Sequence, residues 1–135
     1  KMSKSLDSPR GTVDILDDPS VITRKIKSAV TDSEAEVRYD VQAKPGVSNL
    51  LSILGAATGR TPEQAAGDYT MYGPLKADTA DAVVELLRPI QTRFAELEAD
   101  PAETSRLLRI GADKARAIAS VILERARSNI GLLAP

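Results

Sequence analysis

The sequence predicts an all-α fold, a bundle of about five to six helices. Apolar side chains recur at helical spacing along most of the chain. An alternation typical of a strand occurs once, between residues 37 and 41, and has no second run to pair with. Proline also follows a capping residue at three predicted helix starts, Asp18-Pro19, Thr61-Pro62 and Asp100-Pro101.

The first predicted helix begins at Asp18-Pro19 and ends near residues 31–33. Its apolar stripe consists of Ile22, Ile26 and Ala29. Residues 6–17, which precede it, contain turn residues followed by Val13, Ile15 and Leu16. We therefore expect an ordered linker that docks through these three apolar side chains.

Two shorter helices are predicted next. Lys44-Pro45-Gly46 is expected to form a turn, after which Ser48 can cap a helix that ends near Gly55 or Gly59. Thr61 and Gln64 have the spacing of a capping box, so a short helix should follow them.

The second half predicts two long amphipathic segments. The first covers residues 75–98, after an expected turn at Tyr72-Gly73-Pro74, and Pro89 should kink it. The second begins at Asp100-Pro101; Gly111 is a possible break in it, and Gly131 suits its end. Its apolar stripe contains Leu107, Leu108, Ala115, Ile118, Ala119, Ile122 and Ala126.

Composition excludes several kinds of site. The 135 residues contain no Cys and no His, which excludes disulfides, cysteine nucleophiles and histidine-based triads or zinc sites. No run approaches the roughly 20 apolar residues of a membrane span, so we expect a cytoplasmic protein. The formal net charge is −1, and the acidic middle lies between mildly basic ends, so any RNA contact should be local.

Residues 1–5 read Lys-Met-Ser-Lys-Ser. A chance match to a given pentapeptide of this kind is on the order of one in two million per position. The segment resembles the KMSKS signature of class I aminoacyl-tRNA synthetases, a loop that handles ATP during amino-acid activation. Activation expels pyrophosphate, and two mobile lysines can neutralise the charge that builds on its oxygens.

Further segments extend the resemblance to the bacterial tryptophanyl-tRNA synthetase family over nearly the whole chain. They are DDP at 17–19, KIKSAVTDS at 25–33, KPGVSNLL at 44–51, YGPLK at 72–76 and LRPIQ at 87–91. The Gly-Tyr-Gly usual in that family is shortened here to Tyr72-Gly73. The resemblance implies a signature loop and linker at 1–17 and a helical anticodon-binding domain at 18–135. The family's Rossmann-like catalytic domain has no counterpart in these residues.

The resemblance also implies roles for individual residues. Lys4 is the main pyrophosphate-facing charge, Lys1 supports it, and Met2, Ser3 and Ser5 complete the ATP-binding loop. Asp32 and Lys76 are implied to face the tRNA anticodon. Judged without the resemblance, Asp32 could equally be a turn residue bonded to its own backbone, and Lys76 a surface lysine.

The family resemblance implies a tryptophan–tRNA ligase that uses ATP with Mg²⁺, L-tryptophan and the cognate tRNA. Family members form homodimers through the catalytic domain, and this part alone is expected to be inactive. Three alternatives stay open: a tyrosine-type synthetase, a stand-alone helical tRNA-binding module, and a helical interaction domain that binds no RNA.

Overall fold

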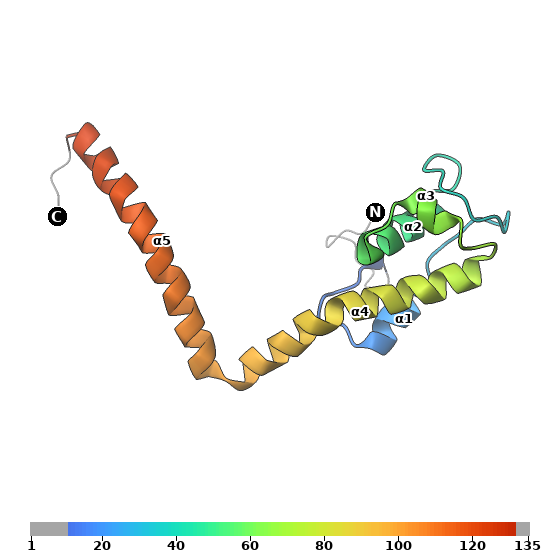
Figure 1. The fold of residues 1–135 in the computed structure, drawn as a ribbon, viewed down its shortest axis with the longest axis horizontal. Helices are drawn as coiled ribbons and strands as arrows, with labels where there is room; N and C mark the ends of the chain where they lie inside the picture. The colour runs from blue at the N-terminus through green and yellow to red at the C-terminus, as the bar shows by residue number, and fades with distance from the viewer. Residues whose placement is uncertain (1–10, 132–135) are drawn as a thin grey trace. The chain divides into compact units, whose positions relative to one another are not determined.

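A computed structural model describes residues 11–131 and confirms the all-α prediction (Figure 1). No strand occurs in this range, and the signature loop lies outside it. The five helices are α1 (Pro19–Lys27), α2 (Pro45–Thr58), α3 (Pro62–Ala66), α4 (Tyr72–Ala99) and α5 (Pro101–Asn129).

Local sequence signals set most of the helix starts. Proline is the first residue of α1, α2, α3 and α5, where its missing N–H costs no helical hydrogen bond. Asp18 caps α1 by accepting from the Ser20 N–H, and Asp100 caps α5 by accepting from the Glu103 N–H. The predicted capping box of α3 is confirmed, with hydrogen bonds in both directions between Thr61 and Gln64.

Two predicted helix boundaries in the first half were wrong. Helix α1 ends at Lys27, several residues before the expected end, because Ser28 already forms its C-cap. Helix α2 begins at Pro45, within the expected turn. Ser48 does not cap it; its hydroxyl is buried and accepts a hydrogen bond from the Asp40 N–H at 2.9 Å.

The second half also differs from its prediction. Tyr72 is the first residue of α4 rather than part of a turn. The helix contains Pro89 as expected and ends at Ala99, and the kink at Pro89 stays a prediction. Helix α5 is not divided at Gly111. The predicted end is confirmed, since Gly131 has a φ of 74° and follows the C-cap Ile130.

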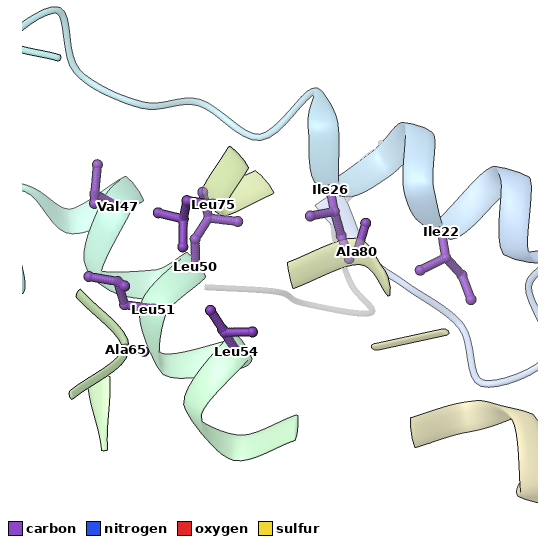
Figure 2. Packing of buried hydrophobic residues seen from close by; sticks show 9 residues of the cluster. All are labelled: Ile22, Ile26, Val47, Leu50, Leu51, Leu54, Ala65, Leu75 and Ala80. Atoms are coloured by element: carbon purple, nitrogen blue, oxygen red, sulfur yellow. The ribbon is translucent and has the colours of Figure 1, made fainter. Parts of the chain in front are cut away.

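The chain divides into two compact units, with the boundary inside α4 between Thr92 and Arg93. The hydrophobic core belongs to the first unit and draws on α1, α2, α3 and α4 (Figure 2). Its members are Ile22, Ile26, Val47, Leu50, Leu51, Leu54, Ala65, Leu75 and Ala80. Helices α2 and α3 lie in direct contact. The predicted domain boundary at residue 17 stays a prediction.

The linker before α1 is fixed to α4 by a polar side chain. The Gln91 amide nitrogen donates to the carbonyl oxygens of Ile15 at 2.8 Å and Asp17 at 3.0 Å. The Asp17 carboxylate also pairs with Lys25 of α1 at 2.6 Å. Of the three expected docking residues, Val13 packs on the core, whereas Ile15 and Leu16 stay exposed. Linker residues 13–17 are therefore held mainly by polar contacts.

The second unit has a different character from the first. It consists of the end of α4 and all of α5, and no residue of α5 is buried. Across residues 11–131, no helix is both long and apolar enough to span a lipid bilayer.

Gly46 should be intolerant of a side chain. A Cβ at this position would lie 2.2 Å from the backbone carbonyl oxygen of Val30, and that oxygen cannot move away as a side chain could. We expect Gly46→Ala to lower the free energy of unfolding by about 1–3 kcal/mol, as overpacking does elsewhere. Urea unfolding of the purified chain measures the change.

Gly73→Ala is the matched control, because nothing lies within 4 Å of a Cβ built at Gly73 and the residue is in the first turn of α4. It should leave the free energy of unfolding unchanged or raise it by up to about 1 kcal/mol. Equal losses in the two variants would contradict the close approach of α2 to the Val30 carbonyl.

Candidate functional site

The predicted site residues fall into two groups. Lys1, Met2, Ser3, Lys4 and Ser5 lie outside the described residues. Asp32 and Lys76 are described, and both are half-buried. The geometry below therefore concerns the segment between α1 and α2, where Asp32 lies, and the start of α4, where Lys76 lies.

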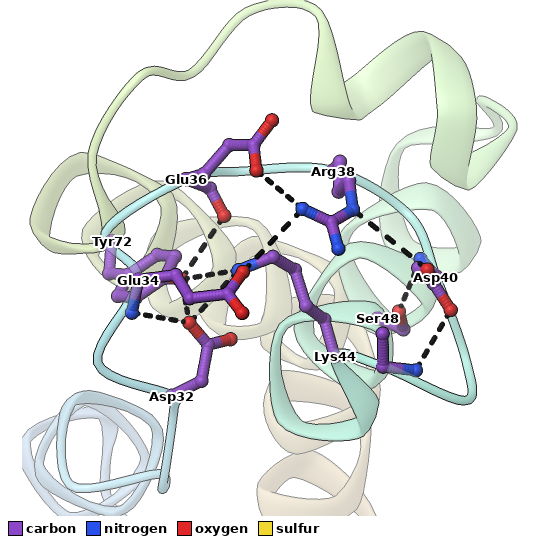
Figure 3. Close-up of polar contacts among 9 residues, drawn as sticks. Asp32, Glu34, Glu36, Arg38, Asp40, Lys44, Ser48 and Tyr72 are labelled. Carbon is purple, nitrogen blue, oxygen red and sulfur yellow. Dashed lines mark hydrogen bonds and ion pairs between the residues drawn. The ribbon is translucent and has the colours of Figure 1, made fainter.

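Lys44 is the centre of a polar cluster between these elements (Figure 3). It is the N-cap residue of α2, and its side chain is fully buried. The ammonium contacts Asp32 Oδ1 at 2.9 Å, Glu34 Oε2 at 2.8 Å and the Tyr72 hydroxyl at 3.2 Å. An ammonium has three N–H donors, so these contacts use all of them. We call Asp32, Glu34, Lys44 and Tyr72 the Lys44 cluster.

The two carboxylate oxygens of Asp32 have different surroundings. Oδ1 accepts from Lys44, from the Tyr72 hydroxyl and from the Glu34 N–H. Oδ2 is buried and has no hydrogen-bond partner among residues 11–131. A buried acceptor without a partner is unfavourable by roughly 1–3 kcal/mol, so a donor that reached Oδ2 would be bound favourably. Such a donor can approach only if a neighbouring side chain moves, because Oδ2 is closed to solvent.

The Lys44 cluster favours the charged forms of its members. The hydrogen bond from Tyr72 and then that from Lys44 hold the pKa of Asp32 well below its ordinary value of 3.8. Burial opposes the charge on Lys44, but hydrogen bonds from its ammonium to Glu34, Asp32 and Tyr72 outweigh burial and raise its pKa. The ion pair is therefore fully formed at neutral pH.

A second layer of polar contacts supports the same segment. Arg38 forms ion pairs with Glu34 and Glu36 and lies 3.8 Å from Asp40. The Asp40 carboxylate accepts from two backbone N–H groups, those of residues 42 and 43, which shapes the turn that leads to Lys44. Ala35 has a φ of 56°, a left-handed conformation that is uncommon for a residue with a side chain. The segment is thus shaped by side-chain contacts and not by regular secondary structure.

Lys76 is near the Lys44 cluster along α4 but is not a member of it. It lies four residues after Tyr72, so the two side chains share one face of the helix. No hydrogen bond or ion pair of Lys76 occurs within residues 11–131. Asp32 is therefore held by its neighbours, whereas no described residue holds the Lys76 ammonium in this way.

Sequence reasoning missed Lys44 and Tyr72. It assigned both to turns, yet both are ordered by contacts with residues far away in the chain. No local pattern could reveal these contacts, because Tyr72 and Asp32 are 40 residues apart. The one local signal was the position of Lys44 directly before Pro45, and it only weakly indicates a buried lysine.

Asp32→Asn should change how stability depends on pH. The pKa of Asp32 is lower in the folded chain, so its carboxylate adds stability above the unfolded pKa of about 3.8 and loses it as pH falls. We expect the stability difference between wild type and Asp32→Asn to have its full size from about pH 5 upward and to shrink steadily below about pH 4. Urea unfolding at a series of pH values measures it.

Asp81→Asn, an exposed residue on α4, is the control for the same chemical change. A difference for Asp32→Asn that stays constant with pH would contradict the pairing inside the Lys44 cluster.

No group of His, Cys, Asp or Glu side chains among residues 11–131 could hold a metal ion.

Comparisons with known proteins agree with the sequence resemblance. The family described as "tRNA synthetases class I (W and Y)" matches residues 1–88. Tryptophan–tRNA ligase 1 of Streptomyces coelicolor is 50% identical over 100% of this chain, which covers 40% of that protein. Tryptophan–tRNA ligase of Mycobacterium leprae is 47% identical over 98% of the chain and 39% of that protein.

A solved structure shows the same likeness in three dimensions. The crystal structure of tryptophanyl-tRNA synthetase from Mycoplasma pneumoniae superposes with a TM-score of 0.83 at 28% identity. The match covers 98% of this chain and 41% of that chain. The chain thus spans about two-fifths of the length of the relatives it matches. Since the family match covers more than half of its residues, the chain belongs to the class I tRNA synthetase family of the W and Y type.

Proposed function

We propose that this chain is the signature-loop and tRNA-binding part of a tryptophan–tRNA ligase. That enzyme activates tryptophan with ATP and passes the aminoacyl group to its tRNA. The observation that carries the proposal is the 50% identity with a tryptophan–tRNA ligase over all 135 residues. Similarity at this level extends beyond the signature loop to the segments that build the core and the Lys44 cluster.

In this proposal Lys1-Met2-Ser3-Lys4-Ser5 handles the triphosphate. Lys4 faces the pyrophosphate oxygens and Lys1 adds a second positive charge, which favours the transition state as charge develops on the leaving group. Met2, Ser3 and Ser5 complete the ATP contacts. Magnesium bound with ATP would neutralise further phosphate charge.

The contacts of the linker after the signature loop support a role for the helices of the first unit in anchoring that linker. Gln91 and Lys25 hold residues 15–17 against α4 and α1. Residues 15–17, which follow the signature loop in the sequence, are therefore fixed on the first unit. We propose that the helical part supports the loop through this anchored segment.

For the tRNA, we propose that Asp32 and Lys76 contact the anticodon. Asp32 Oδ2 accepts no hydrogen bond from the part of the chain that the structure describes, and a base amino group such as that of cytosine is a suitable donor for it. Lys44 and Tyr72 hold the other oxygen, so they position the carboxylate. Lys76 is one helical turn beyond Tyr72 and can donate to a base or a phosphate.

The nearest alternative is a tyrosine-type synthetase, because the matching family description includes both types. The tryptophan ligases at 47–50% identity favour the first reading. Under the proposal the full-length synthetase would be a cytoplasmic homodimer that pairs through its catalytic part, as the resemblance implies.

Lys4→Ala in the full-length synthetase tests the proposed activity. Removing one group that stabilises developing charge should slow tryptophan-dependent pyrophosphate exchange by about a hundredfold or more. Lys114→Ala, an exposed lysine of α5, is the matched control and should leave the rate near that of wild type.

Exchange that depends on tyrosine and not on tryptophan would support the alternative. A Lys4→Ala rate equal to the wild-type rate would contradict the assigned role of the loop.

A further inference from the structure

Three cations of the first unit form no ion pair within residues 11–131. They are Arg24 and Lys27 of α1 and Lys76 of α4. Every other lysine or arginine between residues 11 and 92 is paired with a carboxylate. Lys76 already has a proposed role at the anticodon, whereas the two cations of α1 have none. We call Arg24 and Lys27 the α1 basic pair.

The α1 basic pair lies on the face of the helix that points away from the core. Ile22 and Ile26 are the buried residues of α1 (Figure 2). Arg24 follows Ile22 by two residues, which places it on the opposite face of the helix. Lys27 lies three residues after Arg24, so the two are neighbours on the helix surface, and both are exposed. A ligand can therefore contact both cations without any rearrangement of α1.

No carboxylate of α1 competes for these cations. The helix contains no Asp or Glu. The two carboxylates that precede it are already engaged, because Asp17 pairs with Lys25 at 2.6 Å and Asp18 accepts from the Ser20 N–H at 2.8 Å. The helix dipole favours cations in this last turn, but it does not neutralise them. The α1 basic pair is therefore a local excess of positive charge in a chain whose formal net charge is −1.

The charge around Asp32 requires such an excess if the ligand is RNA. Residues 32–44 contain four carboxylates and two cations, a formal net charge of −2. This segment repels phosphates, whereas contacts between cations and phosphates supply much of the affinity for a nucleic acid. Phosphate contacts also fix the position of the strand, while base contacts give the specificity. An RNA whose base reaches Asp32 therefore needs cations beside this acidic segment.

The α1 basic pair is located at the start of the same segment. Lys27 is the last residue of α1, and Asp32 follows it by five residues. Five residues span at most about 18 Å, a distance that a few nucleotides of one strand cover. A strand that presents a base to Asp32 can therefore place its neighbouring phosphates at α1.

We propose that the α1 basic pair binds phosphates of the tRNA strand next to the base that reaches Asp32. The proposal rests on the proposed function for the identity of the RNA, and it adds a backbone-binding surface separate from the anticodon contacts. Arg24 supplies a planar guanidinium that can hold two oxygens of one phosphate, and Lys27 supplies a point charge. The pair thus contributes affinity and position, whereas Asp32 contributes specificity.

The salt dependence of tRNA binding by the full-length synthetase tests this proposal. Affinity for a transcript of the cognate tRNA is measured by fluorescence titration at several KCl concentrations. Arg24→Ala and Lys27→Ala should each make the slope of log affinity against log salt shallower by about 0.7–0.9, the value for one phosphate contact. Each should weaken binding of a transcript with an altered anticodon by the same factor. Lys27→Arg, which keeps the charge, should retain the wild-type slope.

Arg88→Ala is the matched control, because it removes the same charge from an exposed residue of the first unit that is paired with Glu85. Its slope should equal that of wild type. Wild-type slopes in both α1 variants would overturn the proposal. An equal change in Arg88→Ala would overturn it too, since the net charge of the protein would then be the cause.

A loss of affinity confined to the cognate anticodon would also contradict the proposal, because phosphate contacts carry no sequence information. Tryptophan-dependent pyrophosphate exchange needs no tRNA. Measured on the same samples, it shows separately whether the proposed function holds.

Discussion

The buried ammonium of Lys44 is the interaction on which the first unit depends. Its three partners lie in the segment after α1 and at the start of α4, while Lys44 itself caps α2. A buried charge that loses a partner is strongly unfavourable, so each of these elements has to be in place for the others to be stable. The apolar core beside it has no comparable directionality, because hydrophobic burial is indifferent to orientation. We infer that the directional contacts of the Lys44 cluster favour this arrangement of α1, α2 and α4 over others that the apolar core alone would allow.

The Lys44 cluster stabilises the first unit and also positions Asp32, the candidate site residue. Oδ1 of Asp32 accepts hydrogen bonds from Lys44, Tyr72 and the Glu34 N–H, whereas Oδ2 has no partner among the described residues. At the other end of the unit, Gln91 and Lys25 fix the linker that follows the signature loop. Linker residues 15–17 and Asp32 thus both belong to the first unit, which contains α1, α2, α3 and the first part of α4. Helix α5, by contrast, belongs to the second unit and has no buried residue.

How much the sequence could predict depended on the range of the contacts. The starts of α1, α3 and α5 were predictable because Asp18, Thr61 and Asp100 act on neighbours two or three residues away. The start of α2 was not, because Ser48 is used for a bond to Asp40 and Lys44 is fixed by Tyr72, 28 residues distant. Asp32 was predicted as a site residue from the family resemblance, and no physical property of its sequence context indicated that role. The helical periodicity of the apolar residues in α5 was predicted correctly. An apolar stripe in the sequence does not show which surface packs against it.

Charging of tRNA by the full-length synthetase tests most directly the proposal that the Lys44 cluster holds Asp32 where it contacts tRNA. Asp32→Asn and Lys76→Ala should each lower kcat/KM for tRNA by about tenfold or more, the size of one good base or phosphate contact. Tryptophan-dependent pyrophosphate exchange, which needs no tRNA, should stay near wild type in both, and Asp81→Asn should change neither rate. Charging by Asp32→Asn that matches Asp81→Asn would contradict the account and leave the cluster with a structural role alone.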